Sequence, residues 1–222
     1  MIFQHRQLEK TLEWTENNHL CELVIESPVF LRQVLKEFNN TDEKHSLSFT
    51  EAEKLLSFEN DIGVICNPLK LDFNNRRATT TLLKMLVKSS LSETFYLETS
   101  KLKSKIVKYL GSLIDNENFN FEVVSDDFSI DDLAKATSLH IVGDEDDFIE
   151  LITDYMTMMT ELASTKMFIF MNLRSLLTED ELIRLRRNLD NRQINVLMVE
   201  DVDRGKLDGV QRIIVDKDRC EV

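Results

Sequence analysis

Glycine and proline are scarce in this chain, which has 5 Gly and 2 Pro among 222 residues. Collagen-like repeats, propellers and loop-rich β-sandwiches need many more turn-forming residues, so this composition argues against them. Hydrophobic residues make up 42% of the chain and charged residues 30%, as in a globular and not a disordered protein. We therefore expect long helices combined with a compact sheet, in one domain or one and a half.

Signals for membranes and for an oxidising compartment are also missing. No run of eighteen apolar residues is present, so we expect no membrane span. The start, MIFQHRQLEK, lacks the basic and apolar regions of a signal peptide. The three cysteines, Cys21, Cys66 and Cys220, form no CxxC pair, which argues against a disulfide framework and a thiolate zinc site. These features favour the reducing cytoplasm.

Motifs for the common catalytic mechanisms are absent as well. The chain contains no GxxxxGK[ST], GxGxxG, HExxH or GxSxG. The acidic pairs Asp180-Glu181 and Glu200-Asp201 invite a catalytic role, but each lies at the end of a predicted element. Helix capping and exposure to solvent explain carboxylates at such places. We therefore predict no catalytic residue and no enzymatic activity.

Apolar runs predict the strands of an α/β domain. Nearly continuous runs of this kind, typical of strands covered on both faces, occur at 20–26, 62–66, 167–171 and 195–199. The run RIIVD, with its apolar part at 211–215, suits an edge strand. Helices are expected after Ser27-Pro28 and after Thr178, where Glu181 completes a capping box for a helix to about Asn191. Alternating strands and helices predict a mainly parallel sheet.

The middle of the chain is expected to be helical. Residues 75–115 contain no strand-like run and one glycine. Apolar residues recur there at helical spacing, at Leu82, Met85, Leu86, Leu102, Ile106, Tyr109, Leu110 and Leu113. A further amphipathic helix is predicted over 146–163, with Asp144 as a candidate N-cap. We therefore expect an α/β head made of 1–69 and 151–222, with an inserted helical arm at 70–150.

Charge is distributed very unevenly around a net value of −13. Residues 70–110 carry nine Lys or Arg and three acidic residues, whereas 111–154 carry one basic and thirteen acidic residues. A chain that is acidic on average thus contains one basic segment.

Basic residues in that segment fall into two helical stripes. Arg77, Lys84 and Lys88 form one, and Lys101, Lys105 and Lys108 form the other. Rows of cations suit a phosphate backbone, because each contact releases counterions whatever the base sequence. The candidate DNA-binding residues are Arg76, Arg77, Lys84, Lys88, Lys101, Lys103, Lys105 and Lys108. Few aromatics accompany them, which favours duplex over single-stranded DNA. The alternative interpretation is an ordinary solvated helix face.

Crowded carboxylates in the acidic segment repel one another unless cations bind. Hard oxygen ligands suit Ca²⁺, which accepts six to eight of them with loose geometry. The spacing is not that of an EF-hand, because counting from Asp115 places Asn120 where the turn needs glycine. The alternative here is an acidic surface with capping carboxylates.

Several segments together resemble a known family. They are PVFLRQVLKEF, SLSFTEAEKLL, IGVICNPLKLDFNNRRATTTLLKML and MFIFMNLRSLLTEDELIRLRRNLDNRQINVLMVE. In order and spacing they are similar to the accessory adaptation protein of type II-A CRISPR systems, over residues 20–216. No single motif among them is specific by itself.

This resemblance implies an α/β head related to P-loop nucleotide hydrolases, without their phosphate loop or a nucleotide cofactor, and with an inserted helical arm. It implies a homotetrameric ring that encircles double-stranded DNA, prefers its ends and slides along it. It implies Ca²⁺ at the arm and a role in spacer acquisition for antiviral defence, beside the CRISPR integrase proteins and the RNA-guided effector nuclease. Aligning the acidic stretch implies the calcium ligands Glu122, Asp126, Asp127 and Asp132.

Two other classes of function stay open at this point. One is a cryptic nucleotide-binding or phosphoryl-transfer enzyme on the same head, and the other is a pure protein adaptor. The helix after Thr178 departs from the family by its extra basic residues Arg184, Arg186 and Arg187. Contacts between subunits and additional contacts with DNA are both open roles for them.

Overall fold

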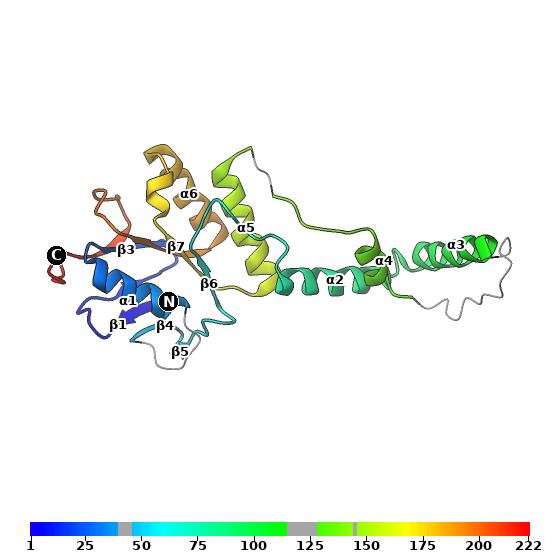
Figure 1. Cartoon of the computed structure of the whole chain (residues 1–222), viewed down its shortest axis with the longest axis horizontal. Helices are drawn as coiled ribbons and strands as arrows, with labels where there is room; N and C mark the ends of the chain where they lie inside the picture. Colours follow the sequence, from blue (N-terminus) through cyan, green and yellow to red (C-terminus); the bar gives the residue numbers. More distant parts are fainter. Residues whose placement is uncertain (40–45, 115–127, 144–145) are drawn as a thin grey trace. The chain divides into compact units, whose positions relative to one another are not determined.

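The described residues form two compact units. A computed structural model describes residues 1–39, 46–114, 128–143 and 146–222 (Figure 1). Unit 1 consists of Met1–Phe73 and Val142–Val222, and unit 2 consists of Asn74–Ile141.

Unit 1 is built on a five-stranded sheet in the order β6-β7-β8-β3-β9, in which every neighbouring pair is parallel. Its strands are β3 (Leu20–Ile25), β6 (Ile62–Ile65), β7 (Met167–Met171), β8 (Asn195–Glu200) and β9 (Gln211–Val215). The predicted parallel α/β sheet is thereby confirmed, and β9 lies at an edge as expected. The strand predictions succeed because strands buried on both faces must be apolar at almost every position.

A second sheet was not predicted. It is antiparallel, in the order β2-β1-β4-β5. Its strands are β1 (Ile2–His5), β2 (Leu12–Glu13), β4 (Leu47–Glu51) and β5 (Lys54–Leu55). These strands have only two to five residues, which is too short for their alternating pattern to stand out in the sequence.

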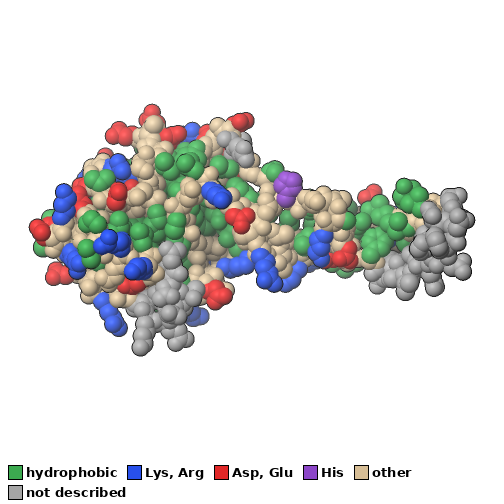
Figure 2. Space-filling model, in the orientation of Figure 1, with side chains coloured by type: hydrophobic (Ala, Val, Ile, Leu, Met, Phe, Trp, Pro, Cys, Tyr) green, Lys and Arg blue, Asp and Glu red, His purple; other side chains and the backbone are tan. Residues whose placement is uncertain are grey.

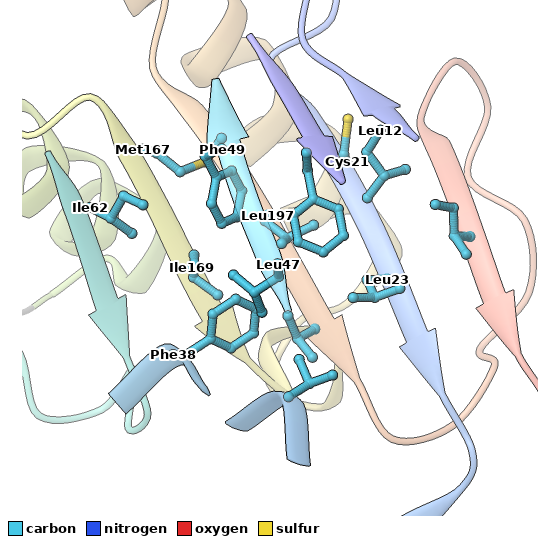
Figure 3. Packing of buried hydrophobic residues seen from close by; sticks show 14 of the residues in the cluster. Leu12, Cys21, Leu23, Phe38, Leu47, Phe49, Ile62, Met167, Ile169 and Leu197 are labelled. Atoms are coloured by element: carbon cyan, nitrogen blue, oxygen red, sulfur yellow. The ribbon is translucent and has the colours of Figure 1, made fainter. Parts of the chain in front are cut away.

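One face of the parallel sheet packs against α1 (Pro28–Asn39) and the small antiparallel sheet. Phe49 and Leu47 of β4 lie over Leu197 and Ile169 of the parallel sheet (Figure 3). Phe49 is fully buried, and its ring centroid lies 5.0 Å from that of Phe3, 6.0 Å from that of Phe58 and 6.2 Å from that of Trp14. This aromatic group joins the two sheets into one core.

The opposite face is covered by α5 (Phe148–Ala163) and α6 (Glu179–Arg192) (Figure 1). A short 3₁₀ helix, η1 (Leu173–Leu176), connects β7 to the segment before α6. The predicted capping box of α6 is confirmed, because the Thr178 hydroxyl accepts from Glu181 N–H and the Glu181 carboxylate accepts from Thr178 N–H at 2.8 Å. Asp147, and not Asp144, is the N-cap of α5, and Asp144 lies outside the described residues.

Unit 2 contains α2 (Arg76–Ser90), α3 (Tyr96–Ile114) and α4 (Ile130–Ala136), and α2 packs against α4. Asn74 closes the unit where the chain enters and leaves it. Its side-chain amide donates to Ile141 O at 2.9 Å, and its side-chain oxygen accepts from Ile141 N–H at 2.7 Å. None of the described helices is long and apolar enough to cross a lipid bilayer.

Replacing Phe49 by Ala is expected to lower the free energy of unfolding by about 3–5 kcal/mol, because it empties the centre of the core shared by the two sheets. Denaturant unfolding followed by fluorescence of Trp14, the one tryptophan in the chain, measures this change. Ile183→Ala is the control, because Ile183 is 68% exposed on α6 and its loss should cost less than about 0.5 kcal/mol. Equal losses in the two variants would contradict a shared core.

Candidate nucleic-acid interface

All eight candidate DNA-binding residues lie on two helices of unit 2. Arg76, Arg77, Lys84 and Lys88 belong to α2, and Lys101, Lys103, Lys105 and Lys108 belong to α3. The start of α2 is set by Asn75, whose side-chain oxygen accepts from Ala78 N–H at 3.1 Å. No acidic residue occupies the first turn of α2.

The stripe on α2 is exposed. Arg77, Lys84 and Lys88 are separated by seven and four residues, which places them on one side of the helix. Figure 2 shows Lys and Arg side chains gathered along α2. The neighbouring side of α2 faces α4 across a groove of about 410 Å³ lined by Thr80, Leu83, Lys84, Val87, Asp131 and Lys135. Lys84 thus lies at the border between the stripe and this groove.

The stripe on α3 consists of Lys101, Lys105 and Lys108, all of them exposed. Within the part of the chain that the structure describes, these lysines make no ion pair. Lys103 differs from them because it points elsewhere on the helix and is half-buried. Its ammonium lies 5.6 Å from the centroid of the Phe128 ring, at the distance of a cation–π contact. Among the described residues, the stripe therefore has three cations without an ion pair, and Lys103 supports the packing of unit 2.

Apolar side chains on α3 are exposed beside the lysines. Leu102 is 47% exposed, Tyr109 63% and Leu113 49%. Figure 2 shows this apolar group over α3. The predicted amphipathic face thus exists, but within unit 2 the described residues leave it open to solvent. Contiguous exposed apolar side chains of this kind mark surfaces that bind other molecules.

Of the four candidate calcium ligands, the structure describes one. Asp132 occupies the third position of α4 and closes a capping box, in which its carboxylate accepts from Ser129 N–H at 3.2 Å. Neighbouring Asp131 accepts from the Lys135 ammonium at 2.7 Å, and this bond lowers the pKa of Asp131. Glu122, Asp126 and Asp127 lie outside the described residues. The described residues contain no group of three metal-binding side chains, so the calcium site stays a prediction.

The extra arginines of α6 have partners inside unit 1. Arg184 donates to Asp147 at 2.6 Å, which lowers the pKa of that carboxyl, and Arg186 lies 3.8 Å from Asp190 and donates to Asp208 O. Arg187 is exposed. Two of the three arginines thus hold the fold of unit 1 together.

Open α/β proteins bind ligands at the carboxyl edge of the parallel sheet. The site lies at the topological switch point, between two neighbouring strands where the strand order reverses. Here that point lies between β3 and β8. The turn from β3 to α1 is only Glu26 and Ser27, and Pro28 at the start of the helix has no N–H. A phosphate loop needs a longer run of backbone N–H groups.

The position of Glu200 at the end of β8 differs from the expectation from sequence, which was that this carboxylate is exposed to solvent. The side chain of Glu200 is fully buried, so exposure to solvent does not explain it. Glu22 in the middle of β3 is fully buried as well. The burial of Glu22 could have been predicted from the sequence, because a glutamate inside a continuous apolar strand has no exposed face to occupy.

A family model described as CRISPR-associated protein (Cas_Csn2) matches residues 39–219, which is most of the chain. The match spans both basic helices and the acidic segment that follows them.

Replacing Lys101, Lys105 and Lys108 together by Gln is expected to change the free energy of unfolding by less than about 0.5 kcal/mol, because exposed lysines without ion pairs do not support the fold. Thermal unfolding followed by helical circular dichroism measures it. Asn74→Ala is the contrasting variant, because losing the two bonds that close unit 2 should cost about 1–3 kcal/mol. A loss of helix in the triple variant would mean that the stripe is structural.

Proposed function

The chain belongs to the Csn2 family of CRISPR-associated proteins, and on that premise we propose that it is a non-catalytic protein that binds the ends of duplex DNA without sequence preference. Family membership implies a role in CRISPR adaptation. In the proposed role, four copies form a ring around the DNA during spacer acquisition. The integrase proteins and the RNA-guided effector nuclease are its proposed partners.

One observation carries this proposal: Lys101, Lys105 and Lys108 are exposed in a row without ion pairs among the described residues, in a chain of net charge −13. Thirteen of the forty acidic side chains lie in residues 111–154, the segment that follows the stripe in sequence. A row of exposed cations suits a polyanion that approaches along the helix. Each phosphate contact then gains free energy from the release of counterions.

Assembly into a ring is supported by the apolar side chains beside the lysines. Leu102, Tyr109 and Leu113 are 47–63% exposed in the single chain, so covering them is favourable. Four copies would bring four sets of lysines into one channel while the acidic residues face outward. A cavity lined by one sign of charge focuses the electrostatic field and binds DNA more tightly than one helix alone.

Calcium is the proposed cofactor, held by Glu122, Asp126, Asp127 and Asp132. The donor set consists of carboxylates only, which is the ligand type that Ca²⁺ prefers. Bound calcium would neutralise the like charges of the acidic segment and so favour assembly, because a ligand that binds only the assembled form stabilises it.

A nucleotide-dependent enzyme is disfavoured by the short turn between β3 and α1, which offers no loop for phosphates. A thermal shift with ATP or GTP would revive that alternative. A pure adaptor has no need of an exposed cationic stripe, and it would bind no DNA at any salt concentration.

Binding to a linear duplex is expected to weaken steeply with salt, by on the order of 10²-fold or more between 50 and 200 mM NaCl. Fluorescence anisotropy with a labelled 30-base-pair duplex measures the affinity. The Gln triple variant at Lys101, Lys105 and Lys108 should bind more weakly and show a smaller salt slope. A matched triple, Lys36→Gln with Lys54→Gln and Lys217→Gln, removes the same charge from exposed positions in unit 1 and should bind as the unchanged protein does.

A flat salt response, or equal weakening in both triples, would contradict binding through the stripe. The same duplex joined into a closed circle tests the preference for ends. A threaded ring binds the linear form and not the closed form, whereas equal binding would contradict threading.

Native mass spectrometry is expected to show a tetramer with CaCl₂ and a smaller species with a chelator. Changing Leu102 and Leu113 to Gln should weaken this tetramer by placing polar groups in the covered face. Leu55→Gln with Leu69→Gln is the control, because these residues are 70% and 67% exposed in unit 1. A monomer under all conditions would contradict the ring without bearing on the ionic contact.

A further inference from the structure

A buried ionic cluster lies on one face of the parallel sheet, around the middle of β3 and the end of β8. Glu22 of β3 is paired in register with Arg212 of β9, and Glu200 is paired in register with Val24 of β3. Both glutamates are fully buried, on the face opposite to the shared aromatic core. Carboxylates so far from water need compensation by positive charge or by a proton.

Glu22 is compensated by two arginines. One carboxylate oxygen lies 2.8 Å from Arg174 Nη1 and the other lies 2.5 Å from Arg212 Nε. Both guanidinium groups are nearly buried, with 8% and 11% of their side chains exposed. Arg212 also pairs with Asp203. Glu22 therefore lies at the centre of an ionic network formed by Arg174, Arg212 and Asp203.

The same network fastens the segment that follows β8, residues 201–205. Arg174 donates to Gly205 O at 3.0 Å and to Arg204 O at 3.2 Å. Gly205 N–H in turn donates to the Asp203 carboxylate at 2.8 Å. Arg174 thus connects η1, β3 and the segment 201–205 through one side chain.

Glu200 lacks comparable compensation. One of its oxygens accepts from Arg174 N–H at 3.0 Å, and the other, like the Glu22 oxygen beside Arg212, accepts no hydrogen bond from any described residue. The nearest cation is Arg204, whose Nε is 3.8 Å away and whose side chain is 37% exposed. Burial raises the pKa of Glu200 to about 7, and the negative charge of Glu22 adds to this rise.

We propose that Glu200 is the proton-binding element of a latch that holds residues 201–205 against the carboxyl edge of the parallel sheet. The charged groups around it are Glu22 on β3, Arg174 on η1, Arg212 on β9, and Asp201, Asp203 and Arg204 in the segment itself. When Glu200 is protonated, the buried negative charge beside Glu22 disappears and the segment stays closed. When Glu200 loses its proton, opening exposes the carboxylate to water and is favoured. The latch does not depend on DNA binding.

The direction of the pH effect follows from proton linkage. The closed state binds the proton more tightly than the open state, in which Glu200 has its ordinary pKa near 4.5. The closed state is therefore favoured at low pH, and this advantage is lost as pH rises toward 7. Between pH 8 and pH 6 the opening equilibrium constant should fall on the order of tenfold.

Hydrogen exchange on the full chain tests the latch. Protection factors are measured by mass spectrometry for peptides that cover residues 201–206, at pH 6 and pH 8, after correction for the intrinsic exchange rate. We expect about tenfold greater protection at pH 6 in the unchanged protein. Glu200→Gln should remove the pH dependence, and Glu16→Gln, at an exposed position, should retain it.

Carboxyl ¹³C NMR of the unchanged protein gives an independent test that needs no variant. We expect one glutamate to titrate near pH 7. Equal protection at both pH values, pH dependence that survives in Glu200→Gln, or titration of every glutamate near its ordinary value would each overturn the latch.

Discussion

The requirement that a parallel sheet be covered on both faces governs the structure of unit 1. β3, β7 and β8 are buried almost throughout, so each face must pack against another layer. On one face α5 and α6 supply this cover, and on the other α1 and the antiparallel sheet do so. Phe49 is the point at which the two sheets meet (Figure 3). These layers enclose the apolar core of unit 1.

Unit 2 leaves apolar side chains of α3 exposed to solvent. In the part of unit 2 that the structure describes, the helices enclose no comparable core, and α3 presents half-exposed leucines beside exposed lysines. A helix that keeps both apolar and cationic side chains in water is costly for a single chain and useful for a surface that binds both protein and polyanion. The physical difference between the two units therefore matches the division proposed between a folded head and a DNA-binding, assembling arm.

Two groups of charged side chains lie in contrasting environments, one exposed on unit 2 and the other buried in unit 1. Lys101, Lys105 and Lys108 of α3 remain in water, where an isolated charge is inexpensive and stays available to phosphate. Glu22 and Glu200 are buried away from water, and in the protein interior each charge must be paired with an opposite charge or neutralised by a proton. Arg174 and Arg212 lie within 2.8 Å of Glu22, whereas among the described residues the cation nearest to Glu200 is Arg204, at 3.8 Å and 37% exposed. That imbalance makes the buried carboxylate of Glu200 sensitive to pH.

By itself, the sequence determined the elements whose signal is local. The run MFIFM became β7 at the predicted residues, and Thr178 with Glu181 became the predicted capping box, because continuous burial and capping leave direct marks on the chain. The lysine stripes followed from helical spacing in the same way. Tertiary structure alone decided the short antiparallel sheet, the intrachain use of Arg184 and Arg186, and the burial of Glu200. These depend on residues far apart in the chain, since what surrounds a side chain is set by the strands and helices that pack against it.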